Sequence, residues 1–540
     1  MLLLPMVTLA QMVEHESNTH PEVPETPYTG AHYFQHTTFQ TYMSKIFTST
    51  ENGATQLRTT GNACLDLFAE VGSARQLALT QPEILQGLFV EAWKQDPGTA
   101  FCIALWARAV RLGAGERAVG RVLLKAVHQL APRALAAHLP LLALLGSYKD
   151  YVWVADEIPE LRAAVIKLFA DGVLQGDYYA CKWLPRRCKL YAEVRACTGL
   201  SNAEFRRRVA AASPTVEQKL CAGKAADVEY DKLPSQAFKR YKSFFARTDA
   251  ERLRDCILQK KLNAGAIYPH EVFREFFTRR SRNLEMTAAV INAQWSSLPN
   301  YLPSHGSILP VLDTSGSMTW RSAVIPRHVA NPLALYCAER LPGPFRDKVV
   351  TFSRSAEFID LSTEPTTFDK MKKLLRYNIC ENTNIASVFE LLLRTAEAAE
   401  LPAEAMPGCV LILSDMQFDE GAYYDITLMD ELRLRYKYAG YEFPAVVYWN
   451  LCATNTGVAD SAMDNGALIS GYSPRLLQAV FAGSTADYSE PAPIKLNPLE
   501  VMERALAPIR ERVDVTVLPG IAPILAAADH NPTRGESSRV

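Results

Sequence analysis

Apolar residues recur at helical spacing along the first half of the chain, from about residue 45 to about residue 295. In 82–95, 100–131 and 134–146 they fall at i, i+3, i+4 and i+7, which places them on one face of a helix. Short breaks that contain Gly or Pro separate these stretches. The pattern predicts paired antiparallel helices stacked as an α-solenoid of the HEAT-like type.

The pattern changes after a boundary rich in Pro, Ser and Gly, SSLPNYLPSHGS at 296–307. Beyond it, short apolar runs alternate with helical patterns. The runs are 308–313, 348–353, 356–361, 409–414, 445–450 and 466–471, and the helical patterns lie near 328–341, 385–400, 427–438 and 474–483. Strands that alternate with helices predict crossover connections and a doubly wound, mostly parallel sheet. The expected fold class is therefore a helical solenoid followed by an α/β domain.

These changes of pattern also predict the limits of the domains. The polar, Pro-containing start of the chain is expected to be an extension of the body, and the polar end a solvated tail. The expected parts are an N-terminal arm at 1–44, the helical solenoid at 45–300, the α/β domain at 301–485, a C-terminal helix and extension packed on the body at 486–525, and the tail at 526–540.

Three clusters of oxygen-bearing side chains flank the expected strands and helices of the second half. Asp313, Ser315 and Ser317 come at the end of the first apolar run. Thr383 lies just before an expected helix, and Asp415 ends a second apolar run. Because ligands bind beyond the carboxyl ends of strands in such sheets, these side chains are candidates for one site. Oxygen ligands without His or Cys favour Mg²⁺ or Mn²⁺, although each cluster alone would also suit a helix cap or a turn.

The order of these clusters resembles the metal-ion-dependent adhesion site of von Willebrand factor A domains. The stretch DTSGS at 313–317 gives D-x-S-G-S after a buried strand, and a Thr and a strand-ending Asp follow in the same order. The resemblance implies that all five side chains hold one divalent cation. It also implies an open coordination position, which an exposed carboxylate of a protein partner would fill.

A second resemblance covers residues 50 to 480, most of the chain. A helical solenoid followed by an A domain is similar to the TROVE (Ro autoantigen) architecture, and more closely to an uncharacterised, TROVE-like family of unknown function. The stretches that carry it include TENGATQLRTTGNACLDLF, LGSYKDY, CKWLP, VEYDKLPSQAFKRYKSFF, GAIYPHEV, SDMQFDE and VVYWNL. The resemblance implies a helical region that binds structured or misfolded noncoding RNA on basic surfaces.

The distribution of charge gives a separate indication of an anionic partner. Residues 181–282 hold 23 Lys and Arg against 11 Asp and Glu, a local net charge of +12; the whole chain has −1, so the remaining residues carry −13. Basic and aromatic residues alternate there, which would suit phosphates and unpaired bases. The candidate RNA-binding residues are Lys182, Arg186, Arg187, Arg206, Arg207, Arg208, Lys239, Arg240 and Lys242. The alternative is a set of solvated helix faces with the aromatic rings, such as Tyr241, Phe244 and Phe245, in the core.

Composition narrows the class of protein without identifying it. No apolar run reaches the ~18 residues needed to span a bilayer, and the apolar start lacks the basic region of a signal peptide. The 11 cysteines form no C-x-x-C pair, so we expect reduced thiols and a cytoplasmic protein.

Two other motifs are expected to have structural roles. The stretch RLGAGER at 111–117 lacks the preceding strand and the Lys of a phosphate loop, so it predicts a turn between helices. His270 is expected to be structural rather than catalytic.

We therefore expect a non-enzymatic binding scaffold, because the chain pairs no general base or nucleophile with the cation site. Noncoding RNA is the expected ligand of the helical region, and a protein with an exposed carboxylate the expected ligand of the A domain. No membrane and no small-molecule substrate are expected. The alternative is a structural or protein–protein assembly component, for example of a viral or multisubunit particle, with no role in RNA binding.

Overall fold

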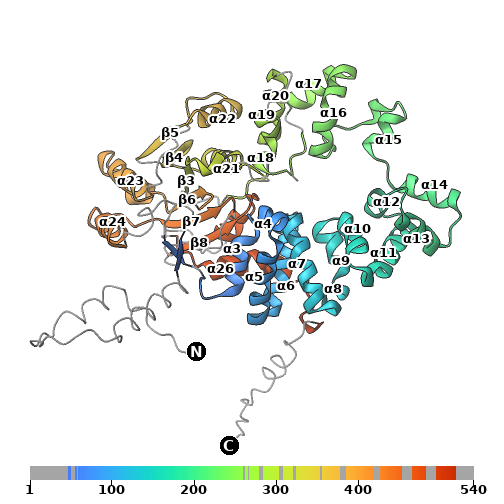
Figure 1. Ribbon diagram of the computed structural model, residues 1–540. Helices are drawn as coiled ribbons and strands as arrows, with labels where there is room; N and C mark the ends of the chain where they lie inside the picture. The colour runs from blue at the N-terminus through green and yellow to red at the C-terminus, as the bar shows by residue number, and fades with distance from the viewer. Residues whose placement is uncertain are drawn as a thin grey trace, which may run out of the picture. The chain divides into compact units, whose positions relative to one another are not determined.

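A helical region leads into an α/β region along the chain, as the sequence pattern predicts (Figure 1). The structure is a computed structural model. It describes residues 47–49, 55–57, 59–259, 262–265, 267–278, 284–302, 308–319, 324–352, 355–377, 385–416, 426–452, 465–481 and 494–517. The predicted arm at 1–44 and the predicted tail at 526–540 lie outside these residues. All described residues belong to one unit, Phe47–Val540, which begins with a short antiparallel pair, β1 (Phe47–Ser49) and β2 (Thr55–Leu57).

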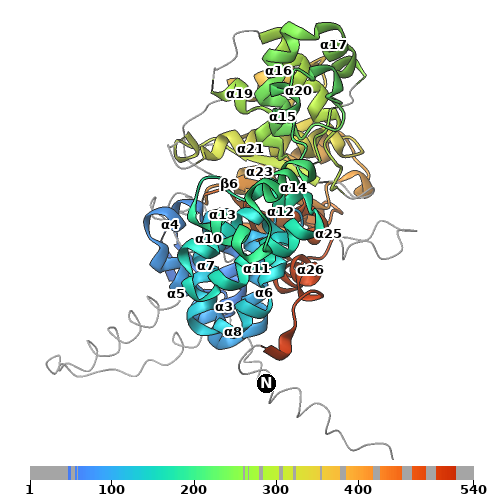
Figure 2. The same ribbon diagram turned by 90° about the vertical axis from the view of Figure 1, so that its right-hand side faces the viewer.

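Consecutive helices form the first half of the described chain (Figures 1 and 2). They are α3 (Ala63–Val71), α4 (Arg75–Thr80), α5 (Pro82–Gln95), α6 (Pro97–Arg108), α7 (Arg117–Leu130), α8 (Pro132–Ala137), α9 (Leu139–Leu141), α10 (Tyr148–Glu157), α11 (Arg162–Gln175), α12 (Tyr178–Trp183), α13 (Lys189–Thr198), α14 (Asn202–Ala212), α15 (Val216–Cys221), α16 (Ser235–Thr248), α17 (Ala250–Leu258), α18 (Pro269–Val272), α19 (Arg274–Phe277) and α20 (Leu284–Ser296). A single π-helical turn, Leu142–Gly146, precedes α10.

Local sequence explains where these helices begin. Asp96 accepts a hydrogen bond from the Thr99 amide and is followed by a Pro, so α6 begins at once after it. Ser147 and Asp150 form a capping box at the start of α10. The predicted turn at 111–117 is confirmed, because α6 ends at Arg108 and α7 begins at Arg117.

The α/β region is built on a six-stranded sheet of order β5-β4-β3-β6-β7-β8. All neighbouring strands are parallel except β5, which runs antiparallel to β4 at one edge. The strands are β3 (Ile308–Asp313), β4 (Lys348–Phe352), β5 (Ala356–Asp360), β6 (Cys409–Ser414), β7 (Ala445–Asn450) and β8 (Gly466–Ser470). The helices are α21 (Pro326–Arg340), α22 (Thr367–Arg376), α23 (Ala386–Ala398), α24 (Ile426–Tyr438), α25 (Leu476–Phe481) and α26 (Pro498–Arg510). The predicted fold class is confirmed.

Both faces of the sheet are covered, which is why its central strands are apolar throughout. Alternate residues of β6 enter different cores: Leu411 belongs to a core shared with α21 and the helical region, and Ile412 to a core shared with α23 and α24. The helical region thus shares one continuous core with one face of the sheet.

Edge strand β8 is fixed against α3 by a contact that requires glycine. The Gly72 amide donates to Ser470 Oγ (2.9 Å), and a Cβ at Gly72 would lie 2.0 Å from the Ser470 carbonyl oxygen. Gly471 follows with a φ of 106°, which L side chains rarely adopt. Because the backbones meet this closely, α3 covers an edge that would otherwise be open to pairing.

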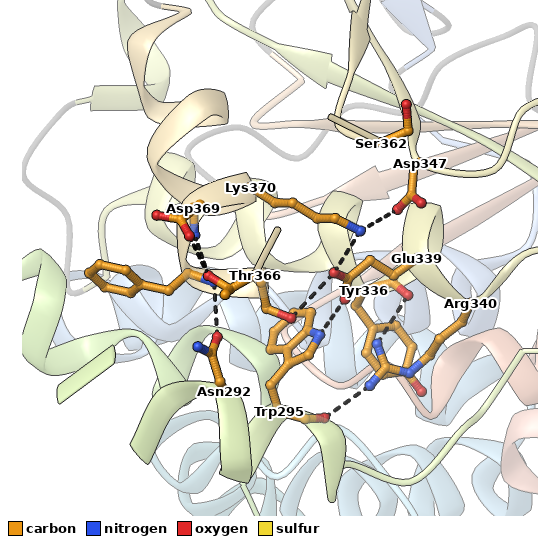
Figure 3. Close-up of polar contacts among 12 residues, drawn as sticks. Asn292, Trp295, Tyr336, Glu339, Arg340, Asp347, Ser362, Thr366, Asp369 and Lys370 are labelled. Atoms are coloured by element: carbon orange, nitrogen blue, oxygen red, sulfur yellow. Dashed lines mark hydrogen bonds and ion pairs between the residues drawn. The ribbon is translucent and has the colours of Figure 1, made fainter. Parts of the chain in front are cut away.

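A second contact between the two regions is a polar network around Glu339, near the end of α21 (Figure 3). Glu339 accepts hydrogen bonds from Trp295 Nε1 of α20 (2.6 Å) and Thr367 Oγ1 of α22 (3.3 Å). Lys370 forms ion pairs with Glu339 (3.2 Å) and Asp347 (2.7 Å), as Figure 3 also shows. The last helix of the helical region is therefore held to two helices of the α/β region by specific, largely buried polar contacts.

The C-terminal helix α26 packs on the body of the molecule. It contacts α25, and it also contacts α6 and α3 of the helical region. Across the described part of the chain, no helix combines the length and the apolar character that crossing a bilayer requires.

Candidate cation site and candidate nucleic-acid interface

The predicted cation ligands begin at the carboxyl ends of β3 and β6, two neighbouring strands in the middle of the sheet. Leu312 of β3 lies opposite Leu413 of β6, so the next residues, Asp313 and Ser414, reach the same edge of the sheet. Asp415 follows directly. The order of strands thus brings together two segments that lie about a hundred residues apart in the sequence.

Hydrogen bonds hold the first cluster in place. Asp313 Oδ1 accepts from the Ser315 amide (2.8 Å), and Ser315 Oγ lies 3.0 Å from Ser317 Oγ. Asp313 Oδ2 accepts from Ser414 Oγ (2.5 Å). Asp313 and Asp415 are buried, with 2% and 5% of their surfaces exposed. Asp313, Ser315 and Ser317 are therefore linked by hydrogen bonds at the end of β3.

The chain turns sharply after the second cluster. Met416 has a φ of 64°, in the left-handed region that is costly for residues other than glycine, and its amide donates to Ser414 Oγ (2.9 Å). Such a conformation persists only where surrounding contacts stabilise it. The residue that adopts it, Met416, is the one directly after the candidate ligand Asp415. Thr383, the remaining predicted ligand, lies outside the described residues.

The side chains present fit a hard divalent cation. Each carboxylate oxygen has two lone pairs, so Asp313 can accept its hydrogen bonds and still offer an oxygen to an ion. Two buried carboxylates and two hydroxyls are the ligand type that Mg²⁺ takes, usually with waters in addition. Among the described residues no three His, Cys, Asp or Glu side chains cluster, so a site of the zinc type is not found there. The cation site itself stays a prediction.

Ser414, whose hydroxyl donates a hydrogen bond to Asp313, was not among the predicted site residues. The only signal was its position before Asp415, and its role depends on the register between β3 and β6. Polar residues also end the next two strands, but they bond to the protein itself. Asn450 accepts from the Cys452 amide (2.9 Å) and Ser470 from the Gly72 amide.

Six of the nine candidate RNA-binding residues lie on α12, on α14 or in the turn between α12 and α13. Arg186 and Arg187 are exposed in the turn between α12 and α13, and Arg206 and Arg207 are exposed on α14. α12 and α14 are in contact with each other. Arg208 is also exposed, but it donates a hydrogen bond to the Leu174 carbonyl of α11 (2.9 Å). The segment from α12 to α14 therefore carries several exposed arginines.

Two candidates on α16, Lys239 and Lys242, make contacts within the protein instead, whereas the third, Arg240, is exposed. Lys239 donates to the Glu271 carbonyl, and Lys242 forms an ion pair with Glu275. Burial lowers the pKa of Lys239 to about 8. Arg240 is exposed and lies 3.7 Å from a carboxylate oxygen of Glu217.

The aromatic residues of α16 are part of a core, as sequence analysis favoured. Phe245 is fully buried, and Tyr241 and Phe244 pack against the same cluster. Tyr241 also donates a hydrogen bond to Glu217 (3.0 Å). These rings are not base-stacking platforms in this structure.

The structure groups two of the candidates, Lys182 and Arg240, with three cations that were not among the predicted residues, and these five residues come from four helices. Lys149 Nζ lies 4.4 Å from the ring centre of Trp183, and Lys182 Nζ lies 5.4 Å from the same ring. The pKa of Lys149 is lowered by partial burial and then by the positive charges of Arg117, Arg121 and Arg240.

Arg121 of α7 contacts two residues of α10, the helix that also carries Lys149. It lies 3.7 Å from buried Asp150 and 5.3 Å from the ring centre of Trp153. The described residues contain no carboxylate within 4.0 Å of the side-chain nitrogens of Lys149 or Lys182. We call Arg117, Arg121, Lys149, Lys182 and Arg240 the five-cation cluster.

Comparisons with known proteins agree with the expected likeness to a family of unknown function. Residues 50–157 and 200–308 match a domain of unknown function (DUF2828), and residues 307–506 match another domain of unknown function (DUF7788). The chain is 25% identical over 515 residues to Uncharacterized protein L728 of Acanthamoeba polyphaga mimivirus. The aligned residues cover 84% of this chain and 87% of that protein. It is also similar to the crystal structure of Deinococcus radiodurans RO (RSR) protein, at 14% identity and a TM-score of 0.34, over 80% of this chain and 93% of that chain.

Proposed function

We propose that this protein is a non-enzymatic scaffold that binds structured RNA on a basic surface of its helical region. The surface comprises the five-cation cluster and the exposed arginines of the α12–α14 segment. The α/β region would bind a divalent cation and, through it, an acidic protein partner. The observation that carries the RNA proposal is the crowding of positive charge around Lys149.

Like charges at close range oppose folding, since each lowers the tendency of its neighbours to stay charged. Three arginines lower the pKa of Lys149 through their positive charges, and they come from two separate helices, α7 and α16. The negative charge of nearby Asp150 raises the pKa of Lys149, but its effect is weaker than that of the arginines. The Asp150 carboxylate already forms an ion pair with Arg108 (2.7 Å). A phosphate backbone would relieve this repulsion, so the cluster is better suited to an anionic polymer than to solvent alone.

The aromatic rings give the cluster a fixed geometry. Lys182 lies 5.0 Å from the ring centre of Tyr178 and donates to its hydroxyl (3.1 Å). Contacts of this type contribute about 0.5–1 kcal/mol each at exposed sites. They hold Lys149 of α10 and Lys182 of α12 without neutralising them, so both ammonium groups remain available to phosphate oxygens.

The cation site supports the second part of the proposal. Cations of this type keep part of their coordination shell for water or a ligand. Asp313 and Asp415 occupy the carboxyl edge of the sheet, whereas the five-cation cluster lies on helices of the other region. The two sites would therefore bind partners of different chemistry.

The RNA proposal is tested with the full-length chain and a synthetic RNA hairpin that carries a single-stranded extension. In the double variant Lys149→Gln, Lys182→Gln we expect RNA affinity to fall about tenfold or more, because two phosphates are no longer neutralised. The slope of log affinity against log salt should become shallower by roughly 0.7–0.9 for each of these phosphates. Fluorescence anisotropy from low to high salt measures both quantities.

The matched control is Lys94→Gln, Lys372→Gln, which removes two lysines that already have carboxylate partners, Glu91 and Asp369. It should bind the hairpin as the unaltered protein does. RNA binding that ignores salt, or that weakens equally in both double variants, would contradict the proposal. Complete absence of RNA binding would leave the assembly component as the better explanation.

A further inference from the structure

A cavity of about 190 Å³ lies between the α6–α7 turn, α25 and α26. Its walls include the apolar side chains of Trp106, Leu112, Ala479 and Pro508. Its charged residues are Arg475 and Arg504. Among the described residues that line the cavity none is acidic, so this part of the lining has a formal charge of +2.

The contacts of the two arginines leave that charge uncompensated within the described residues. Arg475 donates one N–H to the Arg111 carbonyl, and its guanidinium lies 5.9 Å from the ring centre of Tyr301. Both contacts are with neutral groups. Arg504 Nε is buried and has no hydrogen-bond partner in the described part of the chain. A neighbouring carboxylate, Glu503, forms an ion pair with Arg510 instead (2.8 Å).

Guanidinium groups bind carboxylates and phosphates through paired N–H donors. Arg504 is half-buried and has no ion-pair partner among the described residues, so its guanidinium can supply such donors. The apolar walls would enclose a hydrocarbon or aromatic portion of the same ligand. The volume is well below the roughly 300–1,000 Å³ of sites for drug-sized molecules, so the ligand must be small.

From this geometry we propose that the cavity is a binding site for a small organic anion, with a carboxylate or phosphate group between Arg475 and Arg504 and an apolar portion against Trp106 and Pro508. The cavity lies on segments other than those of the five-cation cluster. A small organic anion is a ligand class that was not expected from the sequence. Its binding at this cavity does not depend on RNA binding.

The test uses the full-length chain and two probes, benzoate and phenyl phosphate, with benzyl alcohol as a neutral probe of similar shape. Isothermal titration calorimetry at low ionic strength should show one anion bound per chain and no binding of benzyl alcohol. Arg504→Gln should weaken binding by about tenfold or more, because the charged N–H donors are removed. Ala479→Phe should prevent binding by filling the cavity while both arginines remain.

Arg376→Gln, which removes an exposed arginine of α22, is the matched control and should bind the anions normally. Tighter binding of one probe identifies the charged group that the cavity prefers. Failure of both anions to bind at millimolar concentration would overturn the proposal, and so would equal binding by the Ala479→Phe variant.

RNA titrations of the same variants separate this proposal from the proposed function. Arg504→Gln should bind the RNA hairpin as the unaltered protein does. If that variant loses RNA and the small anions together, the cavity is part of the RNA surface and the inference of a separate small-anion site is wrong. If RNA binding fails in every variant while the anions still bind, only the RNA proposal is rejected.

Discussion

The side chain of Asp313 is oriented by contacts from two separate segments. One oxygen accepts from the Ser315 amide and the other from the Ser414 hydroxyl. A carboxylate held in this way loses little further conformational freedom when it binds an ion. This arrangement makes Asp313 the residue at which the cation proposal is best tested.

We expect Asp313→Asn to reduce Mg²⁺ affinity below detection while the protein stays folded. The amide has nearly the shape of the carboxylate but lacks its negative charge, which a hard cation requires. Calorimetric titration with Mg²⁺ measures the affinity, and circular dichroism measures the fold. Asp171→Asn, which removes an exposed carboxylate of α11, is the control and should bind Mg²⁺ normally. Equal affinity in all three proteins would reject the site.

Glu70 shows the opposite situation, a buried carboxyl group with an unsatisfied atom. Only 4% of Glu70 is exposed, and its Oε2 has no hydrogen-bond partner among the described residues. Burial raises its pKa to about 8, and the negative charge of Asp66 acts in the same direction. The folded protein therefore holds a proton on Glu70 that the unfolded chain releases above its ordinary pKa of 4.5.

Between pH 4.5 and 8 the folded state binds more protons at Glu70 than the unfolded chain does. The free energy of unfolding therefore falls as pH rises through this window. We expect Glu70→Gln to remove the loss, because the amide is neutral at every pH. At pH 7 the gain in unfolding free energy should be up to about 3 kcal/mol, and at pH 4.5 it should be close to zero. Urea denaturation at several pH values measures it. A gain that does not change with pH would show that ionisation of Glu70 is not the cause.

At the scale of the element, α16 shows why a count of basic residues is an incomplete guide to a surface. Phe238 and Phe245 of this helix are buried, and Lys239 and Lys242 next to them bond to Glu271 and Glu275. The density of Lys and Arg in the sequence did not reveal which of them point inward. The arginines of α14, by contrast, are exposed.

We expect Lys239→Met to leave RNA affinity unchanged and to stabilise the protein by about 1–3 kcal/mol at pH 7. Burial lowers the pKa of Lys239 from 10.5 to about 8, so the unfolded chain binds more protons between these values and stability rises with pH there. The gain from Met should therefore shrink between pH 8 and 10.5. Denaturation and anisotropy measure the two effects, and Arg207→Met, which should weaken RNA binding, is the comparison. A large loss of RNA affinity in Lys239→Met would contradict this assignment.

At the scale of the whole molecule, both regions are held in one unit by specific contacts. The Glu339 network joins α20 to α21 and α22, and the approach of Gly72 to Ser470 joins α3 to β8. The cation site and the five-cation cluster nevertheless use different elements and different chemistry. Coordination of a carboxylate depends on the ion, whereas attraction of phosphates is screened by salt.

We expect removal of divalent cations with EDTA to release an acidic protein partner, and high salt in constant Mg²⁺ to release mainly RNA. Because Mg²⁺ also folds RNA, the RNA measurement should be repeated with Asp313→Asn in constant Mg²⁺. That variant should keep its RNA affinity. If it loses RNA as fully as the Lys149→Gln, Lys182→Gln variant does, the two sites act as one and the division proposed here is wrong.

The pattern of apolar residues was enough to predict most of the elements and their order. Periodicity located α5 and the central strands β3, β6 and β7, since a buried strand is apolar throughout and a helix is apolar on one face. It also placed Asp313 and Asp415 at strand ends, because in a parallel sheet the ends of neighbouring strands meet at one edge. It did not indicate α22, whose bounds are 367–376.

Contacts between residues of distant segments follow from how the elements pack in three dimensions. The Ser414 contact depends on strand register, and the five-cation cluster depends on how α7, α10, α12 and α16 pack. The cavity between Arg475 and Arg504 likewise needs the α6–α7 turn to lie against the C-terminal helices. Local patterns encode which face of an element is buried, but charge crowding and cavities arise between elements, and only their packing creates them.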